Sequence, residues 1–126
     1  MKVIAIQAQQ NHLLQGLRNF EESSKPELFL RREKVVDDWY TATNEKSLQM
    51  VKELREKENL LVGPSSGAVM ASMMDYVKNI DEGIFVGIFA DDGRKFKSLY
   101  LQQNLFTEQE YVKCLNNCIM LPSLAY

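Results

Sequence analysis

Two adjacent hydroxyl side chains, set between two glycines, form the stretch of this sequence with the clearest chemical potential. Residues 61–68 (LVGPSSGA) run directly into an apolar pattern at helical spacing. A helix that begins there points its first free N–H groups and the positive end of its dipole toward the turn, which favours anions or electron-rich atoms. Alternatively, Ser65 or Ser66 only caps the helix. Capping and ligand binding are compatible, so both interpretations stay open.

The same stretch also matches the nucleophile elbow of serine hydrolases. Residues 63–67 (GPSSG) satisfy the Gly-x-Ser-x-Gly pattern, and Asp91 is a candidate acid. The chain has one histidine, His12, which lies upstream of Ser65, whereas the hydrolase order places the histidine downstream. Without a base, the serine has no activating partner. A serine hydrolase is therefore the least favoured enzyme class.

Composition indicates one small globular domain, residues 1–126. Hydrophobic residues make up 45% of the 126 residues, charged residues make up 25%, and the formal net charge is −2. This balance argues against binding to nucleic acid or to a membrane surface through bulk charge. No run of residues is long enough to span a membrane, and the N-terminus lacks the layout of a signal peptide, so we expect a cytoplasmic protein.

The two cysteines, Cys114 and Cys118, are too few for a disulfide framework. They also lack the second pair of ligands that a structural zinc site requires. The sequence therefore predicts free thiols and no metal site.

Apolar runs alternate with helical patterns, which is typical of an α/β domain with a mainly parallel sheet. We expect strands at residues 1–8, 35–41 and 83–90; the first and third are buried on both faces, and the second is rich in β-branched and aromatic residues. We expect helices at 44–57, capped by Thr43, and at 69–80, after the serine turn. Short helical pieces follow over residues 94–126. Three strands are few for such a sheet, so one edge should lack a neighbour. Ligands in such sheets bind at the carboxyl ends of strands, where the turns at 63–67 and 91–93 would lie.

Four segments, in this order and at this spacing, share motifs with one enzyme family: 2–7 (KVIAIQ), 14–19 (LQGLRN), 61–68 (LVGPSSGA) and 89–98 (FADDGRKFKS). They resemble the C-terminal part of the cysteine synthase and cystathionine β-synthase family, pyridoxal-phosphate enzymes of fold type II. Ala90 and Asp92 depart from the proline and serine that are common there. The resemblance covers about residues 2–110 and leaves 111–126 as a tail. It implies part of a three-layer sandwich around a small, mainly parallel sheet.

The resemblance also implies roles for individual residues. Ser65 would share a hydrogen bond with the pyridine nitrogen of pyridoxal phosphate, with Gly63 and Ser66 supporting the loop and Asp91 beside the ring. On the substrate side the corresponding residues are Gly16, Leu17 and Arg18. Because a neutral hydroxyl does not stabilise a protonated ring, it suits elimination of a β-substituent followed by addition of a thiol. The implied reaction is β-replacement, in which O-acetylserine or O-phosphoserine and sulfide give cysteine.

Arg18 is the most informative side chain of the substrate-side loop. Its guanidinium could form a bidentate pair with a phosphate leaving group or an anionic sulfur donor. Alternatively, it is a surface arginine paired with Glu21 or Glu22. Both interpretations stay open at this point.

The family's Schiff-base lysine, its asparagine-containing substrate loop and its phosphate-binding loop belong to an N-terminal half that these motifs do not include. None of the ten lysines lies in a matching context. We therefore expect a truncated or split enzyme: a chain that is inactive and binds no pyridoxal phosphate alone, completed by an N-terminal-half chain at the open sheet edge. The alternative from another class is a non-catalytic, self-associating or regulatory module that forms an oligomer through the same edge.

Overall fold

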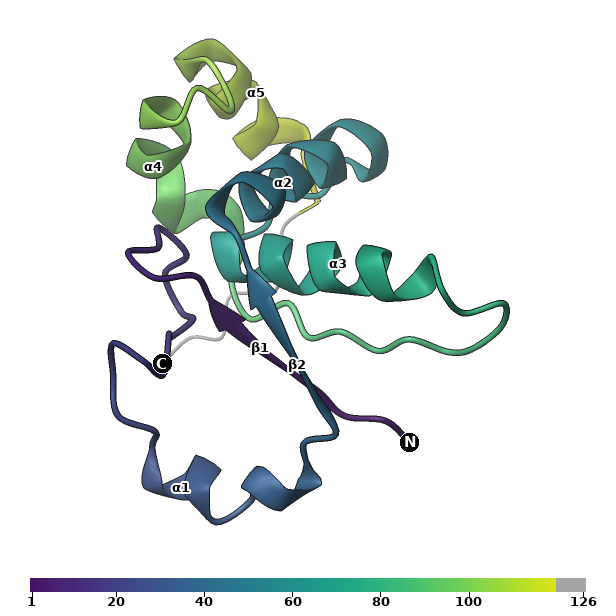
Figure 1. The fold of residues 1–126 in the computed structure, drawn as a ribbon. Helices are drawn as coiled ribbons and strands as arrows, with labels where there is room; N and C mark the ends of the chain where they lie inside the picture. The colour runs from purple at the N-terminus through teal and green to yellow at the C-terminus, as the bar shows by residue number, and fades with distance from the viewer. Residues whose placement is uncertain (120–126) are drawn as a thin grey trace.

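The computed structural model describes residues 1–119 and contains one two-stranded parallel sheet. Strand β1 (Ile4–Ala8) pairs with β2 (Asp38–Ala42), in a register that aligns the first and last residues of the two strands. The connection between them carries the short helix α1 (Glu27–Leu30) and a 3₁₀ turn, Glu33–Val35 (Figure 1). The predicted α/β class with a small parallel sheet is confirmed, with two strands in place of three.

The two faces of the sheet are covered by different layers. Tyr40 of β2 faces helix α3, where its hydroxyl donates to Asp75 at 2.7 Å. Trp39 points to the opposite face and packs against Phe20 and against Phe29 of α1, with ring centroids 5.7 and 5.6 Å away. Because side chains alternate along a strand, α3 and the aromatic cluster lie on opposite sides of the sheet. The sheet is therefore the middle layer of a small three-layer arrangement.

Helix α2 (Asn44–Glu58) follows β2 directly and begins where the sequence predicts. The Thr43 side chain accepts a hydrogen bond from the Lys46 backbone N–H at 3.3 Å, which satisfies one of the free donors of the first turn. The helix ends at Glu58 and is capped by Asn59, whose φ of 55° is in the left-handed region that asparagine tolerates.

Helix α3 (Pro64–Val77) packs tightly against α2. The closest approach is at Gly67, where an added Cβ would lie 2.3 Å from the Ser47 carbonyl oxygen and 2.7 Å from Val51. Only a residue without a side chain fits at this crossing. The glycine that follows the two serines therefore sets the position of α3 as well as leaving room at the turn.

The C-terminal elements complete the core beside α2. They are a 3₁₀ turn (Gly93–Phe96), α4 (Lys97–Gln102) and α5 (Glu108–Asn117), whose capping box joins Thr107 and Glu110. Part of the predicted tail thus belongs to α5, and Tyr111 is buried there. Residues 120–126 of that tail lie outside the described residues. The main core comprises ten buried side chains: Leu48, Val51, Leu54, Leu61, Val62, Phe96, Tyr100, Phe106, Tyr111 and Cys114.

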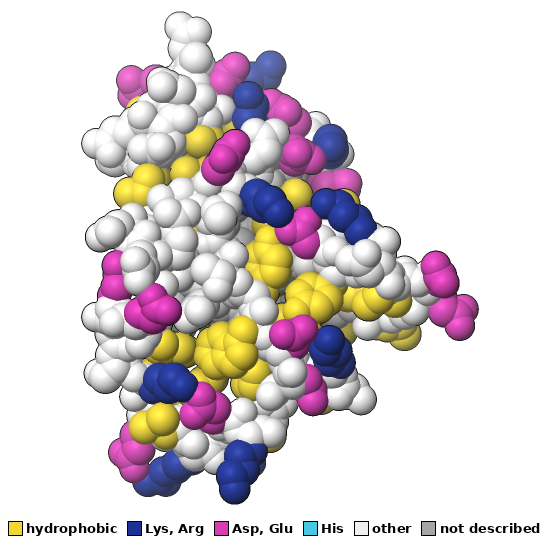
Figure 2. All heavy atoms as spheres, in the orientation of Figure 1, with side chains coloured by type: hydrophobic (Ala, Val, Ile, Leu, Met, Phe, Trp, Pro, Cys, Tyr) yellow, Lys and Arg dark blue, Asp and Glu magenta, His cyan; other side chains and the backbone are white. Residues whose placement is uncertain are grey.

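The prediction of a doubly buried strand at residues 83–90 is wrong. This segment joins no sheet, and Ile84, Val86 and Ile88 are 95%, 87% and 79% exposed. A strand of this composition is buried only when neighbouring strands and a second layer cover it. On the face drawn in Figure 2, hydrophobic side chains gather over the sheet and the adjoining part of α3, with charged side chains around them.

The free-thiol prediction is also wrong, because Cys114 and Cys118 form a disulfide. Residues four apart lie on the same side of a helix, one turn from each other, and here the two Cα atoms are 5.0 Å apart. Within residues 1–119, none of the helices has the length and hydrophobicity that crossing a bilayer requires.

Candidate functional site

The predicted serine turn and the turn at residues 91–93 lie side by side. The Gly63 N–H donates to the Asp91 carbonyl at 2.8 Å, and the Gly93 N–H donates to the Leu61 carbonyl at 3.1 Å. Val62 and Asp92 form an antiparallel bridge between them. The structure therefore brings together two segments that the sequence predicted to lie at one edge of the sheet.

The N-cap of α3 is Gly63, so the prediction that Ser65 or Ser66 caps the helix is wrong. Pro64 occupies the first helical position, where its fixed φ and missing N–H suit a helix start, and this places both serines inside the first turn. The fully buried Ser66 hydroxyl instead donates to the Asp91 carbonyl at 3.3 Å. Ser66 therefore ties the first turn of α3 to the neighbouring segment.

Ser65 faces the predicted substrate-side loop. Gly16 has a φ of +95°, a conformation that favours glycine, and an added Cβ there would lie 3.4 Å from the Ser65 Oγ. Ser65 is 7% exposed, and within residues 1–119 its hydroxyl has no hydrogen-bond partner. A nearly buried hydroxyl with free bonding capacity thus lies at the N-terminus of α3, beside a loop from a distant part of the sequence.

The substrate-side loop is held in place through its backbone. The Ala8 N–H donates to the Arg18 carbonyl at 3.0 Å, and the Asn19 side-chain amide donates to the Ala8 carbonyl at 2.8 Å. Leu17 packs partly buried against Leu14 and the small side chains of the sheet. Asn19 is 5% exposed and is a positioning residue that the sequence analysis missed. It is the last residue of the segment 14–19 (LQGLRN) and directly follows the charged Arg18, so nothing in the local pattern marks a buried amide.

The Arg18 side chain is exposed, and it has no ion pair within residues 1–119. Its two expected partners are engaged elsewhere. Glu21 accepts from the Gln10 side chain, and Glu22 accepts from the Asn11 backbone N–H at 2.8 Å. The interpretation of Arg18 as half of a local surface ion pair is therefore not supported.

Asp91 and Asp92 both have visible structural roles. The Asp91 carbonyl is the acceptor that fixes the serine turn, whereas its carboxylate lies 3.2 Å from the Lys95 Nζ. The Asp92 carboxylate accepts from the Arg94 backbone N–H at 2.8 Å and from its guanidinium, and the bond to the guanidinium is the main cause that lowers the pKa of Asp92. The placement of Asp91 beside a cofactor ring stays a prediction.

Two buried tyrosines brace the site from behind. The Tyr100 hydroxyl donates to the Val62 carbonyl at 2.5 Å, and the Tyr111 hydroxyl donates to the Gly93 carbonyl at 2.9 Å. Burial raises the pKa of Tyr100 far above its usual value, so the phenol stays a donor. The sequence analysis missed both residues, because nothing in the local pattern near 100 or 111 indicates contact with residues 62 and 93.

Comparison with known proteins finds no family model that matches this chain. Among curated proteins, the chain is 30% identical to a cysteine synthase of Aquifex aeolicus over 87% of this chain and 33% of that protein. It is 38% identical to an O-acetylserine dependent cystathionine β-synthase of Bacillus subtilis, over 49% of this chain and 20% of that one. Cysteine synthase A of Escherichia coli is 35% identical over 61% of this chain and 24% of its own length.

Solved structures agree in fold. An O-ureido-L-serine synthase superimposes with a TM-score of 0.73 at 20% identity, covering 90% of this chain and 38% of that one. An O-acetylserine dependent cystathionine β-synthase from Helicobacter pylori gives 0.67 at 23% identity, covering 78% and 34%. The chain is thus a relative of the cysteine synthase and cystathionine β-synthase family that shares part of the fold type II pyridoxal-phosphate enzyme fold and spans a third or less of these curated relatives' length.

Proposed function

We propose that this chain is one part of a pyridoxal-phosphate-dependent β-replacement enzyme that makes cysteine from O-acetylserine or O-phosphoserine and sulfide. It would act only with a second polypeptide that supplies the rest of the site. The observation that carries the proposal is the free Ser65 hydroxyl at the start of α3, facing Gly16 of the substrate-side loop. The relatives named above support the reaction class.

The residues at this turn fit one side of the cofactor. A neutral, nearly buried hydroxyl can share a hydrogen bond with a pyridine nitrogen, and Ser65 would fill that role with Gly63 and Ser66 shaping the turn. When bound, pyridoxal phosphate withdraws electrons from the substrate's α-carbon, which allows the β-substituent to leave and a thiol to add. Ser65, Gly16 and Leu17 would orient the ring and substrate, and the packed turn would exclude water from that side.

The lysine that contacts a predicted site residue is not suited to bind the cofactor at this turn. Lys95 contacts a predicted site residue, but its side chain is 73% exposed and its Nζ pairs with the Asp91 carboxylate. A lysine side chain that lies largely in solvent and pairs with a carboxylate lacks the apolar pocket in which a nucleophilic lysine works. We infer that the lysine and the phosphate-binding loop come from the complementary polypeptide, which restricts cofactor binding to the assembled enzyme.

The proposal can be tested with the part of the Aquifex cysteine synthase that lies outside the matched region, mixed with this chain and pyridoxal phosphate. We expect cysteine formation from the mixture and from neither chain alone. Ser65→Ala should lower kcat by about tenfold or more, because it removes a polar contact to the reacting system, while complex formation stays unchanged. Ser47→Ala is the matched control, since Ser47 is buried in α2 and its hydroxyl has no partner in the described residues. Equal turnover for Ser65→Ala and Ser47→Ala would count against the assigned role.

Arg18 provides a separate test of the substrate class. If the guanidinium pairs with an anionic leaving group, Arg18→Ala should raise the KM for O-phosphoserine by about tenfold and leave the KM for O-acetylserine nearly unchanged. Arg55→Ala is the control, because Arg55 lies on α2 over the Phe106 ring. An equal effect of Arg18→Ala on both substrates would rule out the phosphate assignment.

The exposed apolar side chains at 84, 86 and 88 favour a second candidate, a self-associating module without catalysis. The two candidates predict different behaviour of the isolated chain in analytical ultracentrifugation. A symmetric dimer that stays intact at low micromolar concentration and excludes the complementary polypeptide would favour the module. A chain that leaves its dimer to bind that polypeptide would favour the enzyme.

A further inference from the structure

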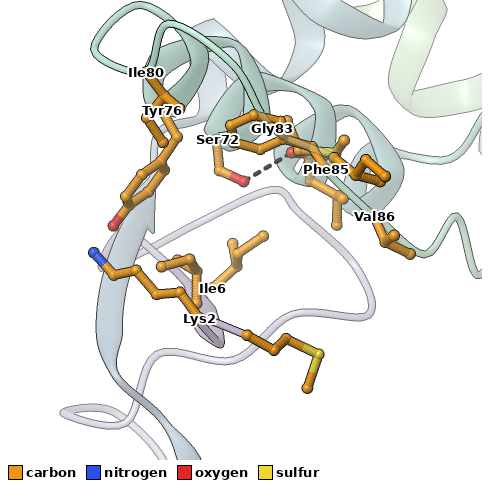
Figure 3. A pocket seen from close by; sticks show the side chains of 14 residues that line it. Lys2, Ile6, Ser72, Tyr76, Ile80, Gly83, Phe85 and Val86 are labelled. Atoms are coloured by element: carbon orange, nitrogen blue, oxygen red, sulfur yellow. Dashed lines mark hydrogen bonds between the residues drawn. The ribbon is translucent and has the colours of Figure 1, made fainter.

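A groove of about 460 Å³ lies between β1 and the segment after α3 (Figure 3). Its floor is α3 from Val69 onward, including Met73 and Tyr76, and Figure 3 shows Ile6 of β1 pointing toward this helix. Lys2 lies at one end, 5.5 Å from the centroid of the Tyr76 ring. The lining is mainly apolar, so the groove suits an uncharged occupant.

One wall of the groove is the outer edge of β1. Val3 and Gln9 use their backbone groups toward the β2 side, where the Val3 carbonyl accepts from Asp37 and the Gln9 N–H donates to Ala42. Because backbone groups alternate between the two edges of a strand, Ile4 and Ile6 direct theirs to the outer edge. Within residues 1–119, neither has a backbone partner there.

The other wall is the segment at residues 83–90. Its side chains alternate as in a strand: Phe85 and Phe89 are partly buried, whereas Ile84, Val86 and Ile88 are exposed. An added Cβ at position 87 would lie 2.5 Å from the Met73 sulfur, so this segment lies directly against α3. Among the described residues, positions 81–90 make no backbone hydrogen bond. The second wall therefore also presents free backbone donors and acceptors.

We propose that this groove receives one β-strand of the complementary polypeptide, paired with β1 on one side and with residues 83–90 on the other. A strand uses backbone groups on both of its edges, whereas a helix bonds internally and would leave both walls unsatisfied. The strand would have apolar side chains toward α3, no charge and no proline at its centre. The choice of partner rests on the proposed function, and the structural relatives support it, because this chain covers only 38% of the synthase chain whose fold it shares.

A second copy of this chain fits the groove less well. Two copies could pair β1 with β1, or residues 83–90 with residues 83–90, but either pairing would leave the other wall of each groove without backbone partners. An inserted strand from a different polypeptide satisfies both walls at once. The number of satisfied backbone groups therefore favours the complementary polypeptide.

Hydrogen–deuterium exchange of the full chain tests this proposal, alone and with the unmatched part of the Aquifex cysteine synthase as the partner. We expect the amides of Ile4, Ile6 and residues 84–90 to exchange freely in the isolated chain and to slow by at least about tenfold in the complex. A complex in which these amides stay unprotected, no complex at all, or protection already present in the isolated chain would each overturn the proposal.

A charged substitution in the groove gives a second readout. Val86→Asp should weaken the complex at least about tenfold, because the groove would bury an unpaired carboxylate. Val112→Asp is the control, since Val112 lies on α5 outside the groove and is 46% exposed. Equal affinity of the two variants overturns the groove assignment. Amide protection in a complex that forms no cysteine would support the groove proposal and contradict the proposed enzyme. Cysteine formation without amide protection would support the enzyme and contradict the groove proposal.

Discussion

The two ends of helix α3 lie in contrasting surroundings. Every residue from 64 to 68 is buried, and this end packs against α2 and the segment at 91–93. At the other end, Met74 and Val77 are each 43% exposed, and Met73 and Tyr76 line the groove. The first end carries the candidate site, whereas the second carries the surface that we assign to a partner. The site turn is therefore held by this chain's own core, and the partner surface is what the chain leaves incomplete.

This difference has a physical consequence for assembly. The serine turn is fixed by backbone bonds from Gly63 and Gly93 and is braced by Tyr100 and Tyr111, so it needs no partner to take its shape. The segment at 83–90 has no comparable support. We expect the chain to provide a preformed half of a site and to gain order at the groove on binding.

The largest difference in stability between the two ends should come from truncating Tyr100, a buried side chain that supports the serine turn. Tyr100→Ala removes a fully buried ring and leaves the Val62 carbonyl without its donor, so the free energy of unfolding should fall by about 3–5 kcal/mol. Ile84→Ala, in the open segment, should change it by less than about 0.5 kcal/mol. Urea unfolding of both variants provides the measurement, and equal losses would remove the distinction between the two ends.

A smaller difference in stability between the two ends should come from replacing one glycine by alanine at each end. Gly67→Ala places a Cβ against the Ser47 carbonyl oxygen at the crossing of α2 and α3, so we expect a loss of about 1–3 kcal/mol. Gly83→Ala meets its nearest atom, on Phe85, at an ordinary 3.6 Å and should be neutral within about 0.5 kcal/mol. Thermal unfolding of the pair gives the comparison. A neutral Gly67→Ala would show that the two helices pack more loosely than described.

The smallest effect should come from the pair that joins β2 to the open end of α3. Burial, together with the hydrogen bond to Asp75, raises the pKa of Tyr40 from 10.0 to about 12. The folded state therefore keeps the phenol protonated to higher pH than the unfolded chain does. Its contribution to stability is full below pH 10 and is lost as the pH rises toward 12.

The Asp75 carboxylate of the same pair makes stability depend on pH at the acid end of the range. The hydrogen bond from Lys46 is the main cause that lowers the pKa of Asp75 below its ordinary 3.8. Its contribution is present above pH 3.8 and is lost as the pH falls below that value. Urea midpoints measured against pH should fall at both extremes, and Asp75→Asn should flatten both falls. An unchanged profile for Asp75→Asn would exclude this pair as the cause.

The features of the fold that depend on a few neighbouring residues, such as helix caps and strand-forming runs, were largely predicted from the sequence. Thr43 caps α2 as its side chain predicts, and the parallel pairing of β1 with β2 follows from two β-type runs separated by a long connection. The N-cap of α3 was mispredicted, because the proline at the first helical position moved the helix start ahead of both serines. Because Pro64 takes the first helical position, Gly63 is the N-cap, and neither Ser65 nor Ser66 can fill that position.

Contacts between segments far apart in the sequence could not be predicted from local patterns. Residues 83–90 have the composition of a buried strand, but burial depends on neighbours that composition cannot supply. The contacts of Tyr100 with Val62 and of Asn19 with Ala8 join segments that share no local pattern. Of the candidate site, the meeting of the serine turn with residues 91–93 was predicted, whereas the side chains that hold it there were not.

We propose that this chain supplies the serine side of a pyridoxal-phosphate site and that another polypeptide supplies the lysine. Borohydride reduction in the presence of pyridoxal phosphate, followed by intact mass measurement, tests it most directly. We predict a single reduced adduct on the complementary polypeptide in the mixture, and no stoichiometric adduct on this chain, alone or mixed. A single stoichiometric adduct on one lysine of this chain alone would contradict the account.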